Sequence, residues 1–141
     1  MAAVPAGDYA VGSTRVEREY GYRLDEERGS DAARRYQWFE NEVPHVVTLD
    51  AYLIDRYLVT NADYQRFVDT TGHGAPFVDE ATWKNSQLIH PYRTVRKFLW
   101  ANGQFPNGRA DHPVVLVDQV DAEAYCTWRG TIENRPLRLP E

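Results

Sequence analysis

The clearest pattern of hydrophobic and polar positions lies in residues 46–72. An alternating stretch comes first, followed by a run rich in aromatic and β-branched side chains, and both are typical of strands. Tyr64, Phe67 and Val68 then follow at the spacing i, i+3, i+4, which places them on one face of a helix. The pattern predicts two short strands that lead into one amphipathic helix.

Both ends of this predicted helix have residues that commonly cap helices. Thr60 can accept a hydrogen bond from an early helical N–H, and Asp63 stands where a capping box and the helix dipole favour a carboxylate. Gly72 can adopt a positive φ and so end the helix. We therefore expect the helix to cover residues 60–71.

Residues 117–130 repeat this pattern and align with residues 59–72 without a gap. Asp118 takes the place of the capping threonine, and Gly130 takes the place of the terminal glycine. A second helix is therefore expected over residues 118–129. Two copies are too few for a solenoid, which needs about three or more repeats.

Each predicted helix has one apolar face, which we expect to pack against a sheet of short, mixed strands. The faces consist of Tyr64, Phe67 and Val68 in the first helix and of Tyr125, Cys126 and Trp128 in the second. Further strands are expected just before Gly12 and at residues 114–117. Together with a length of 141 residues, these elements predict one compact domain of the α+β class.

Two stretches lack a clear pattern. Residues 15–38 are highly charged, which predicts a solvated loop with about one helical turn. Residues 73–111 are expected to form a long irregular insertion, because glycines and prolines interrupt them repeatedly. A stretch of this kind is uncommon in a compact domain and indicates a functional surface or a mobile insertion.

Composition narrows the classes of function. Hydrophobic residues make up 43% and charged residues 26%, as in ordinary soluble domains, and the net charge of −5 argues against a nucleic-acid partner. Arg93, Arg96 and Lys97 form a compact basic cluster, which a solvated face explains better than a phosphate site. No signal-peptide pattern and no membrane-length apolar run is present, so we expect a soluble, cytoplasmic protein without a membrane partner.

The histidines are scattered along the chain, at His45, His73, His90 and His112. They form no helical i, i+4 pair, and none neighbours Cys126 in sequence, so their spacing does not indicate a metal site. His45 and His112 each stand beside a proline before a predicted strand, which favours a capping or hydrogen-bonding role.

Other candidates for chemistry have structural explanations. Cys126 is the single cysteine, which excludes an intrachain disulfide, and its place on an apolar helix face predicts a buried, inert thiol. Asp118 and Asp121 stand at a helix start, where capping explains them better than catalysis. We therefore assign no catalytic, cofactor-binding or metal-binding residue in this chain.

Several motifs nevertheless occur in a fixed order. They are Pro-Ala-Gly-Asp-Tyr-Ala-Val-Gly-Ser (5–13), Asn-Glu-Val-Pro-His-Val-Val-Thr-Leu (41–49), Val-Thr-Asn-Ala-Asp-Tyr (59–64), Asp-His-Pro-Val-Val (111–115), Ala-Tyr-Cys-Thr-Trp-Arg-Gly (124–130) and Arg-Leu-Pro (138–140). In this order they resemble the motifs of the formylglycine-generating enzyme family, also called sulfatase-modifying factors. The resemblance does not extend to residues 14–40 or to most of residues 73–110.

The resemblance implies a variant of the C-type-lectin-like fold, loop-rich and mixed α/β. It also implies oxidation of a target-protein cysteine to formylglycine with O₂, by a complete domain that uses copper and calcium. In the family the active cysteine pair and the metal sites lie in the C-terminal half, and residues 1–141 resemble only the N-terminal portion. We therefore expect a truncated domain, to which no catalytic residue is carried over.

Three positions qualify the resemblance. Gln119 stands where the family pattern usually has tryptophan, and Glu141 stands where it has threonine. Cys126 matches a cysteine that forms a structural disulfide in some members.

Two other interpretations of the motifs stay open. One is a domain of an iron-dependent sulfoxide synthase, although no helical bundle precedes the motifs here. The other is a non-enzymatic, lectin-like binding module, with residues 73–111 as its recognition surface. The expected partners are a C-terminal half or a second copy, which would cover Leu137, Leu139 and residues 114–117, and a protein or peptide substrate.

Overall fold

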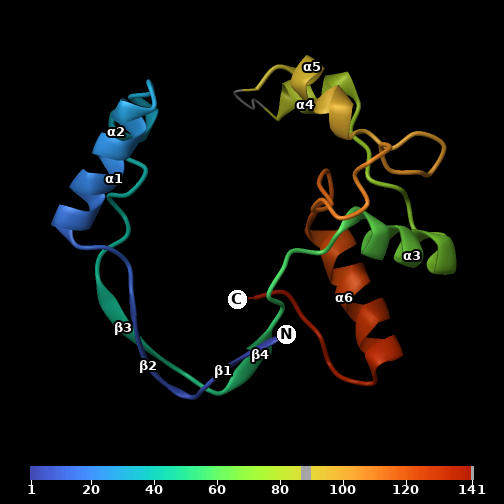
Figure 1. The fold of residues 1–141 in the computed structure, drawn as a ribbon, viewed down its shortest axis with the longest axis horizontal. Helices are drawn as coiled ribbons and strands as arrows, with labels where there is room; N and C mark the ends of the chain where they lie inside the picture. Colours follow the sequence, from blue (N-terminus) through green and yellow to red (C-terminus); the bar gives the residue numbers. More distant parts are fainter. Residues whose placement is uncertain (87–89, 141) are drawn as a thin grey trace. The chain divides into compact units, whose positions relative to one another are not determined.

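The computed structural model describes residues 1–86 and 90–140. They gather into two compact units, Met1–Arg56 and Tyr57–Glu141 (Figure 1). The first unit contains β1 (Ala2–Val4), β2 (Gly7–Val11), α1 (Arg15–Glu27), α2 (Ala32–Arg35), β3 (His45–Leu49) and β4 (Tyr52–Ile54). The second contains α3 (Asn61–Thr71), α4 (Glu80–Asn85), α5 (Tyr92–Val95), the 3₁₀ helix η1 (Arg96–Phe98) and α6 (Gln119–Glu133).

The strands of the first unit form a two-stranded antiparallel ribbon (Figure 1). β1 pairs with β4 and β2 pairs with β3 in one common register, with Val4 opposite Tyr52 and Gly7 opposite Leu49. Pro5 lies where the ladder is interrupted, because it has no N–H to donate. The prediction of a mixed sheet was wrong, since the strand pairs of the described residues are all antiparallel.

The charged stretch predicted as a loop contains α1 and α2 instead. Thr14 caps α1 in a full capping box: its hydroxyl accepts from Glu17 N at 3.3 Å, and its own N–H donates to the Glu17 carboxylate at 2.7 Å. Tyr22 is buried on this helix, and its ring centroid lies 5.1 Å from that of Phe39. The Thr-x-x-Glu signal was present in the sequence, but the weak hydrophobic periodicity concealed it.

In the second unit, α3 confirms the predicted helix to within one residue. The Thr60 hydroxyl accepts from Asp63 N at 3.1 Å, and it donates to the Asp63 carboxylate at 2.7 Å. Gly72 ends the helix with a φ of 73° and donates its N–H to Val68 O. Capping signals and hydrophobic periodicity indicate the same bounds here, so the sequence was sufficient to predict this helix.

The other predicted helix is also present, as α6, but it continues past Gly130. Asp118 and Asp121 form the capping box, and Asn134, at a φ of 50°, takes the C-cap. The prediction that Gly130 ends the helix was wrong. A Cβ at Gly130 would lie 2.8 Å from Arg135 O, so the glycine is required for the close return of the chain.

The apolar faces of α3 and α6 pack against each other, not against a sheet. The rings of Tyr64 and Tyr125 are stacked with centroids 5.6 Å apart, and Phe67 meets Tyr125 edge-on at 5.7 Å. Trp100 contributes a buried ring from outside these helices. The core of this unit is therefore a cluster of aromatic rings between two helices.

Two predicted strands are short or absent. Of residues 52–59, only β4 is a strand, and residues 114–117 form none. Pro113 makes one isolated bridge with Thr60, and Leu116, at a φ of 65°, turns the chain out of an extended path.

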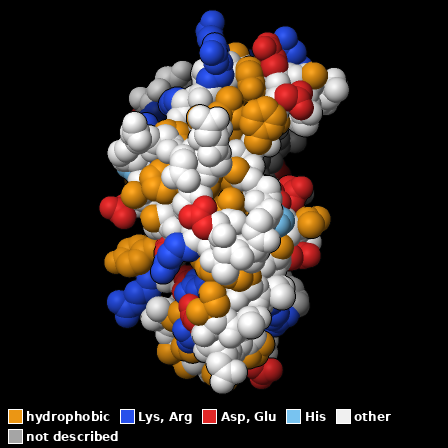
Figure 2. All heavy atoms as spheres, turned by 90° about the vertical axis from the view of Figure 1, so that its right-hand side faces the viewer, with side chains coloured by type: hydrophobic (Ala, Val, Ile, Leu, Met, Phe, Trp, Pro, Cys, Tyr) orange, Lys and Arg blue, Asp and Glu red, His pale blue; other side chains and the backbone are white. Residues whose placement is uncertain are grey.

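The described part of residues 73–111, a stretch expected to be irregular, contains three short helical elements, α4, α5 and η1. The side chains of this stretch bond it to itself. Trp83 Nε1 donates to His90 O at 2.7 Å, and Tyr92 Oη donates to Val78 O at 3.0 Å. Many large hydrophobic side chains of the chain lie at the surface (Figure 2). None of the helices in the described residues is long and apolar enough to cross a membrane.

Candidate functional site

The histidines are divided between the two units, with His45 in the first and His73, His90 and His112 in the second. His45 Nδ1 lies 2.9 Å from Val43 O in the first unit, as the predicted hydrogen-bonding role requires. In the second unit the backbone carbonyls of His90 and His112 accept hydrogen bonds from Trp83 and from Asn61 N. Within residues 1–86 and 90–140, no group of three His, Cys, Asp or Glu side chains is placed to hold a metal ion.

His73 has a role that the sequence did not reveal. Its Nε2 lies 2.8 Å from Asp121 Oδ1, and its ring packs on Phe67 with centroids 4.7 Å apart. Asp121 thus completes the capping box of α6 and also contacts the chain just after α3. Because these two residues are far apart in sequence, spacing alone could not pair them.

Three polar atoms near the aromatic core have no hydrogen-bond partner among the described residues: Tyr64 Oη, Gln65 Oε1 and Trp128 Nε1. Burial raises the pKa of Tyr64, and the carboxylates of Asp121 and Asp118 raise it further. Tyr64 therefore stays a neutral phenol across the physiological range.

Cys126 is half-buried on α6, where the sequence predicted a buried residue. Its neighbour Tyr125 occupies the fully buried position of the helix face instead. A partly exposed thiol is more accessible to reagents than a buried one.

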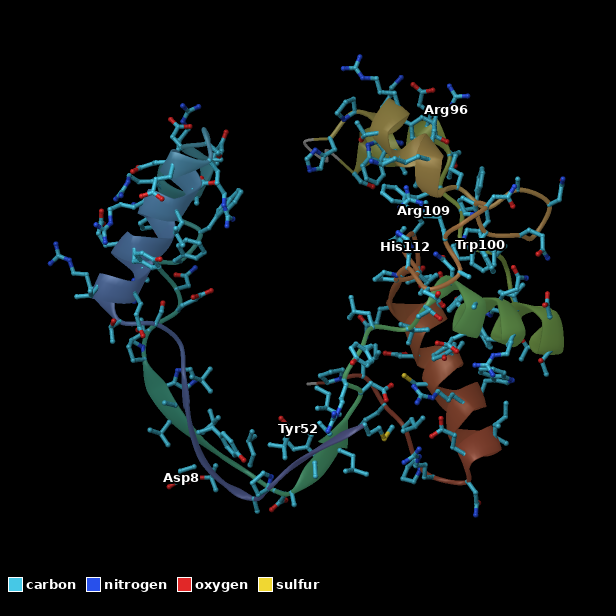
Figure 3. All side chains as sticks on the ribbon, in the orientation of Figure 1. Asp8, Tyr52, Arg96, Trp100, Arg109 and His112 are labelled. Atoms are coloured by element: carbon cyan, nitrogen blue, oxygen red, sulfur yellow. The ribbon has the colours of Figure 1, made fainter. Side chains whose placement is uncertain are left out.

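A cavity of about 140 Å³ lies beside the start of α3. Its apolar lining consists of Phe98, Pro106, Pro113 and Val115, and its polar lining consists of Asn61, Arg109 and His112. Figure 3 shows Arg109 and His112 beside this helix start, with Arg96 on the helical segment beyond them.

Backbone hydrogen bonds fix one wall of this cavity. Asn61 Nδ2 donates to Arg109 O at 2.8 Å, and Asn61 N donates to His112 O at 2.9 Å. Ala62 N donates to Ala110 O at 3.0 Å. Carbonyls of the 109–112 loop thereby satisfy helix N–H groups that would otherwise lack partners.

Positive charge surrounds Phe98, which lines the cavity. Lys97 Nζ lies 4.9 Å from the centroid of this ring, and Arg109 Cζ lies 5.9 Å from it. Arg93, Arg96 and Lys97 are all exposed, as expected for a solvated basic face.

A second hollow, of about 430 Å³, lies in the first unit. Arg15, Arg18, Glu19, Tyr22, Arg34, Gln37 and Glu40 line it. Most of these groups are already bonded: Arg34 pairs with Glu19 at 2.7 Å, and Tyr22 Oη donates to Glu40 at 3.0 Å. Hydrogen bonds from Arg34 lower the pKa of the Glu19 carboxyl. The hollow is a network of internal ion pairs and offers few groups to a ligand.

Comparison with known proteins adds the decisive observation. Residues 1–141 match the family described as the Sulfatase-modifying factor enzyme 1-like domain. The chain belongs to this family. Its mixed helices and small sheets agree with the α+β class predicted from the sequence.

Relatives within the family include two kinds of enzyme. The chain is 32% identical to the formylglycine-generating enzyme of Mus musculus over 92% of its own length and 36% of the relative's. It is 30% identical to the formylglycine-generating enzyme of Bos taurus, over 92% of its own length and 35% of the relative's. It is 35% identical to the hercynine oxygenase of Mycobacterium tuberculosis, over 72% of its own length and 26% of the relative's. The chain thus spans about a third or less of these relatives.

Proposed function

We propose that this chain is part of a formylglycine-generating domain, which oxidises a cysteine of a target protein to formylglycine with O₂. The observation that carries the proposal is the match to formylglycine-generating enzymes over 92% of the chain at 32% and 30% identity. The residues of the chain provide the packed α3–α6 pair and the loops joined to it.

The proposed reaction needs a reductant in addition to O₂. The CH₂–SH group of the target cysteine becomes an aldehyde and loses its sulfur as sulfide, which is a two-electron oxidation. O₂ accepts four electrons, and two thiols supply the other two as they form a disulfide. One oxygen atom of O₂ ends in the aldehyde or its hydrate and the other in water, so atoms and electrons balance.

Among residues 1–86 and 90–140, no group of three His, Cys, Asp or Glu side chains is placed to hold the copper or calcium that the family implies. Copper(I) favours thiolate ligands, and Cys126 is the single cysteine. Calcium favours carboxylate ligands, and two carboxylates of the second unit already have other partners: Asp63 bonds to Thr60 and Arg66, and Asp121 to His73. We therefore derive no step through either metal.

We further propose that the complete domain has the C-type-lectin-like fold. The support is membership of the family and the mixture of short strands, helices and loops in both units. A crystal structure of the complete gene product would test this directly, and a different topology around α3 and α6 would overturn it.

The activity is tested on the complete gene product that contains residues 1–141. It is incubated with a cysteine-containing target peptide, copper, a thiol reductant and air, and the peptide aldehyde is trapped with a hydrazine and detected by mass. The formylglycine-generating enzyme of Mus musculus, assayed in parallel, is the positive control. Aldehyde from the control but none from the gene product would refute the proposal.

A second candidate is an oxygenase that acts on hercynine. The support is 35% identity to a hercynine oxygenase, but this match covers 72% of the chain, against 92% for the formylglycine-generating enzymes. Consumption of hercynine with no aldehyde in the peptide assay would favour this candidate.

A further inference from the structure

The cavity beside α3 combines an apolar interior with one arginine, Arg109, in its lining. Phe98, Pro106, Pro113 and Val115 supply the apolar wall. Its volume of about 140 Å³ is close to that of cavities known to bind a benzene-sized group, roughly 150 Å³. An aromatic ring or a branched aliphatic side chain therefore fits its size and lining.

The cavity is held in shape before any ligand arrives. Asn61 is 6% exposed and bonds through its side chain and its backbone to carbonyls of the 109–112 loop. These bonds use backbone carbonyls of Arg109 and His112 and do not involve their side chains. Preorganisation of this kind lowers the entropic cost of binding.

Arg109, which lines this cavity, and Lys97, next to Phe98 in the chain, have no ion pair with a carboxylate among the described residues. Arg109 is half-buried beside the ring of Phe98, and Lys97 lies over the same ring. The nearest acid in sequence, Asp111, is exposed and makes no ion pair with either. Some other arginines do have an acid partner, as in Arg34 with Glu19, Arg35 with Asp31, Arg66 with Asp63 and Arg135 with Glu133.

We propose that this cavity binds a carboxylate attached to a small apolar group. The apolar group occupies the space among Phe98, Pro113 and Val115, and the carboxylate accepts hydrogen bonds from Arg109, with His112 as the other polar side chain nearby. Arginine is suited to this task because its planar fork matches a carboxylate. The inference does not depend on the oxidase activity, because it rests on this cavity alone.

The test uses the 141-residue chain and phenylacetate as the probe. Binding is followed by chemical-shift changes in two-dimensional NMR spectra and quantified by titration. We expect saturable shifts at residues that line the cavity. Benzyl alcohol, which is similar in shape but neutral, should bind about tenfold more weakly, because one charge-assisted hydrogen bond contributes roughly that factor.

Matched variants separate charge from shape. Arg109→Gln should weaken phenylacetate binding about tenfold or more and leave benzyl alcohol binding unchanged, since the backbone carbonyl that holds Asn61 is retained. Val115→Phe should weaken both ligands by filling the cavity. Arg23→Gln is the control, because Arg23 also lies over an aromatic ring, that of Tyr20 at 5.7 Å, but in the other unit.

A peptide distinguishes the two possible sources of the carboxylate, which are a peptide C-terminus and a small free acid. Acetyl-Gly-Phe with a free C-terminal carboxylate is compared with phenylacetate and with its own C-terminal amide. Tighter binding of the peptide acid identifies a peptide C-terminus, and equal binding identifies a small free acid. Equal affinity for phenylacetate and benzyl alcohol, no saturable shifts, or an unchanged affinity in a folded Arg109→Gln variant would each overturn the proposal.

Discussion

At the scale of single residues, a few side chains determine where the helices of the second unit begin and end. Thr60 starts α3 through its hydroxyl, and Gly130 lets the chain return close to α6. In both cases the side chain, or its absence, acts on a nearby backbone group: the N–H of Asp63 for Thr60 and the carbonyl of Arg135 for Gly130. Single substitutions can therefore measure each effect.

Thr60→Ala should lower the free energy of unfolding by about 1 kcal/mol, because the N–H of Asp63 loses its acceptor. Chemical denaturation measures this change. Thr70→Ala is the matched control, since Thr70 is an exposed threonine of the same helix whose hydroxyl only bonds back to Arg66 O. Equal midpoints for the two variants would contradict the capping role.

The same variant also predicts a change with pH. The hydroxyl of Thr60 and, secondarily, the guanidinium of Arg66 lower the pKa of the Asp63 carboxyl below its ordinary value of 3.8. Stability from this carboxylate is therefore present above that value and is lost as the pH falls through the lower, folded pKa. Thr60→Ala should lose less stability on acidification than the wild type, and parallel acid titrations would argue against the interaction.

Gly130→Ala should destabilise the fold by about 1–3 kcal/mol, the range typical of overpacking. The added Cβ would lie 2.8 Å from Arg135 O, which is backbone and cannot move aside alone. Gly74→Ala is the control, because a Cβ there meets nothing within 4 Å. Thermal melts that shift equally for both variants would show that the close approach is unimportant.

At the scale of elements, the capping residues of α6 also help to join it to α3. The His73–Asp121 contact links the chain after α3 to the first turn of α6, next to the stacked rings of Tyr64 and Tyr125. The pairing of the two helices therefore combines aromatic packing with one polar contact at its edge.

His73→Ala should lower the free energy of unfolding by roughly 1 kcal/mol, because a hydrogen bond to a carboxylate and the contact with Phe67 are both lost. Equilibrium denaturation measures this. His45→Ala is the control, since His45 is exposed and bonds only to a carbonyl two residues away. If the two substitutions lower the free energy of unfolding equally, the contact of His73 with Asp121 does not contribute to stability.

At the scale of the whole molecule, the exposed apolar surface differs from the one expected. Leu137 and Leu139, which we expected in the exposed apolar surface, are half-buried. The ribbon instead exposes Val46 at 67% and Leu53 at 57%. Two-stranded ribbons are marginal in water, and open strand edges and apolar faces promote association.

We therefore expect the isolated 141-residue chain to self-associate, with a mass that rises with concentration in light scattering. Leu53→Lys should shift it toward the monomer by placing a charge on the ribbon. Val16→Lys is the control, because Val16 is equally apolar and 77% exposed but lies on α1. A monodisperse wild-type monomer at all concentrations would contradict this expectation.

The sequence by itself determined the features that depend on near neighbours. Residue spacing was enough to find the helices α3 and α6 and their caps at Thr60 and Asp118, because these are local signals. The sequence motifs of the family are local in the same way. The helix α1 carried such a signal too, in Thr14 and Glu17, but its charged surface masked the periodicity that would have supported it.

Only the tertiary structure decided what packs on what. Residues 114–117 have strand composition, yet Leu116 turns them aside, and the faces of α3 and α6 meet each other because their aromatic rings stack closely. The His73–Asp121 contact and the cavity at Arg109 likewise join segments distant in sequence. Such contacts depend on the path of the chain through space, and neither composition nor periodicity encodes that path locally.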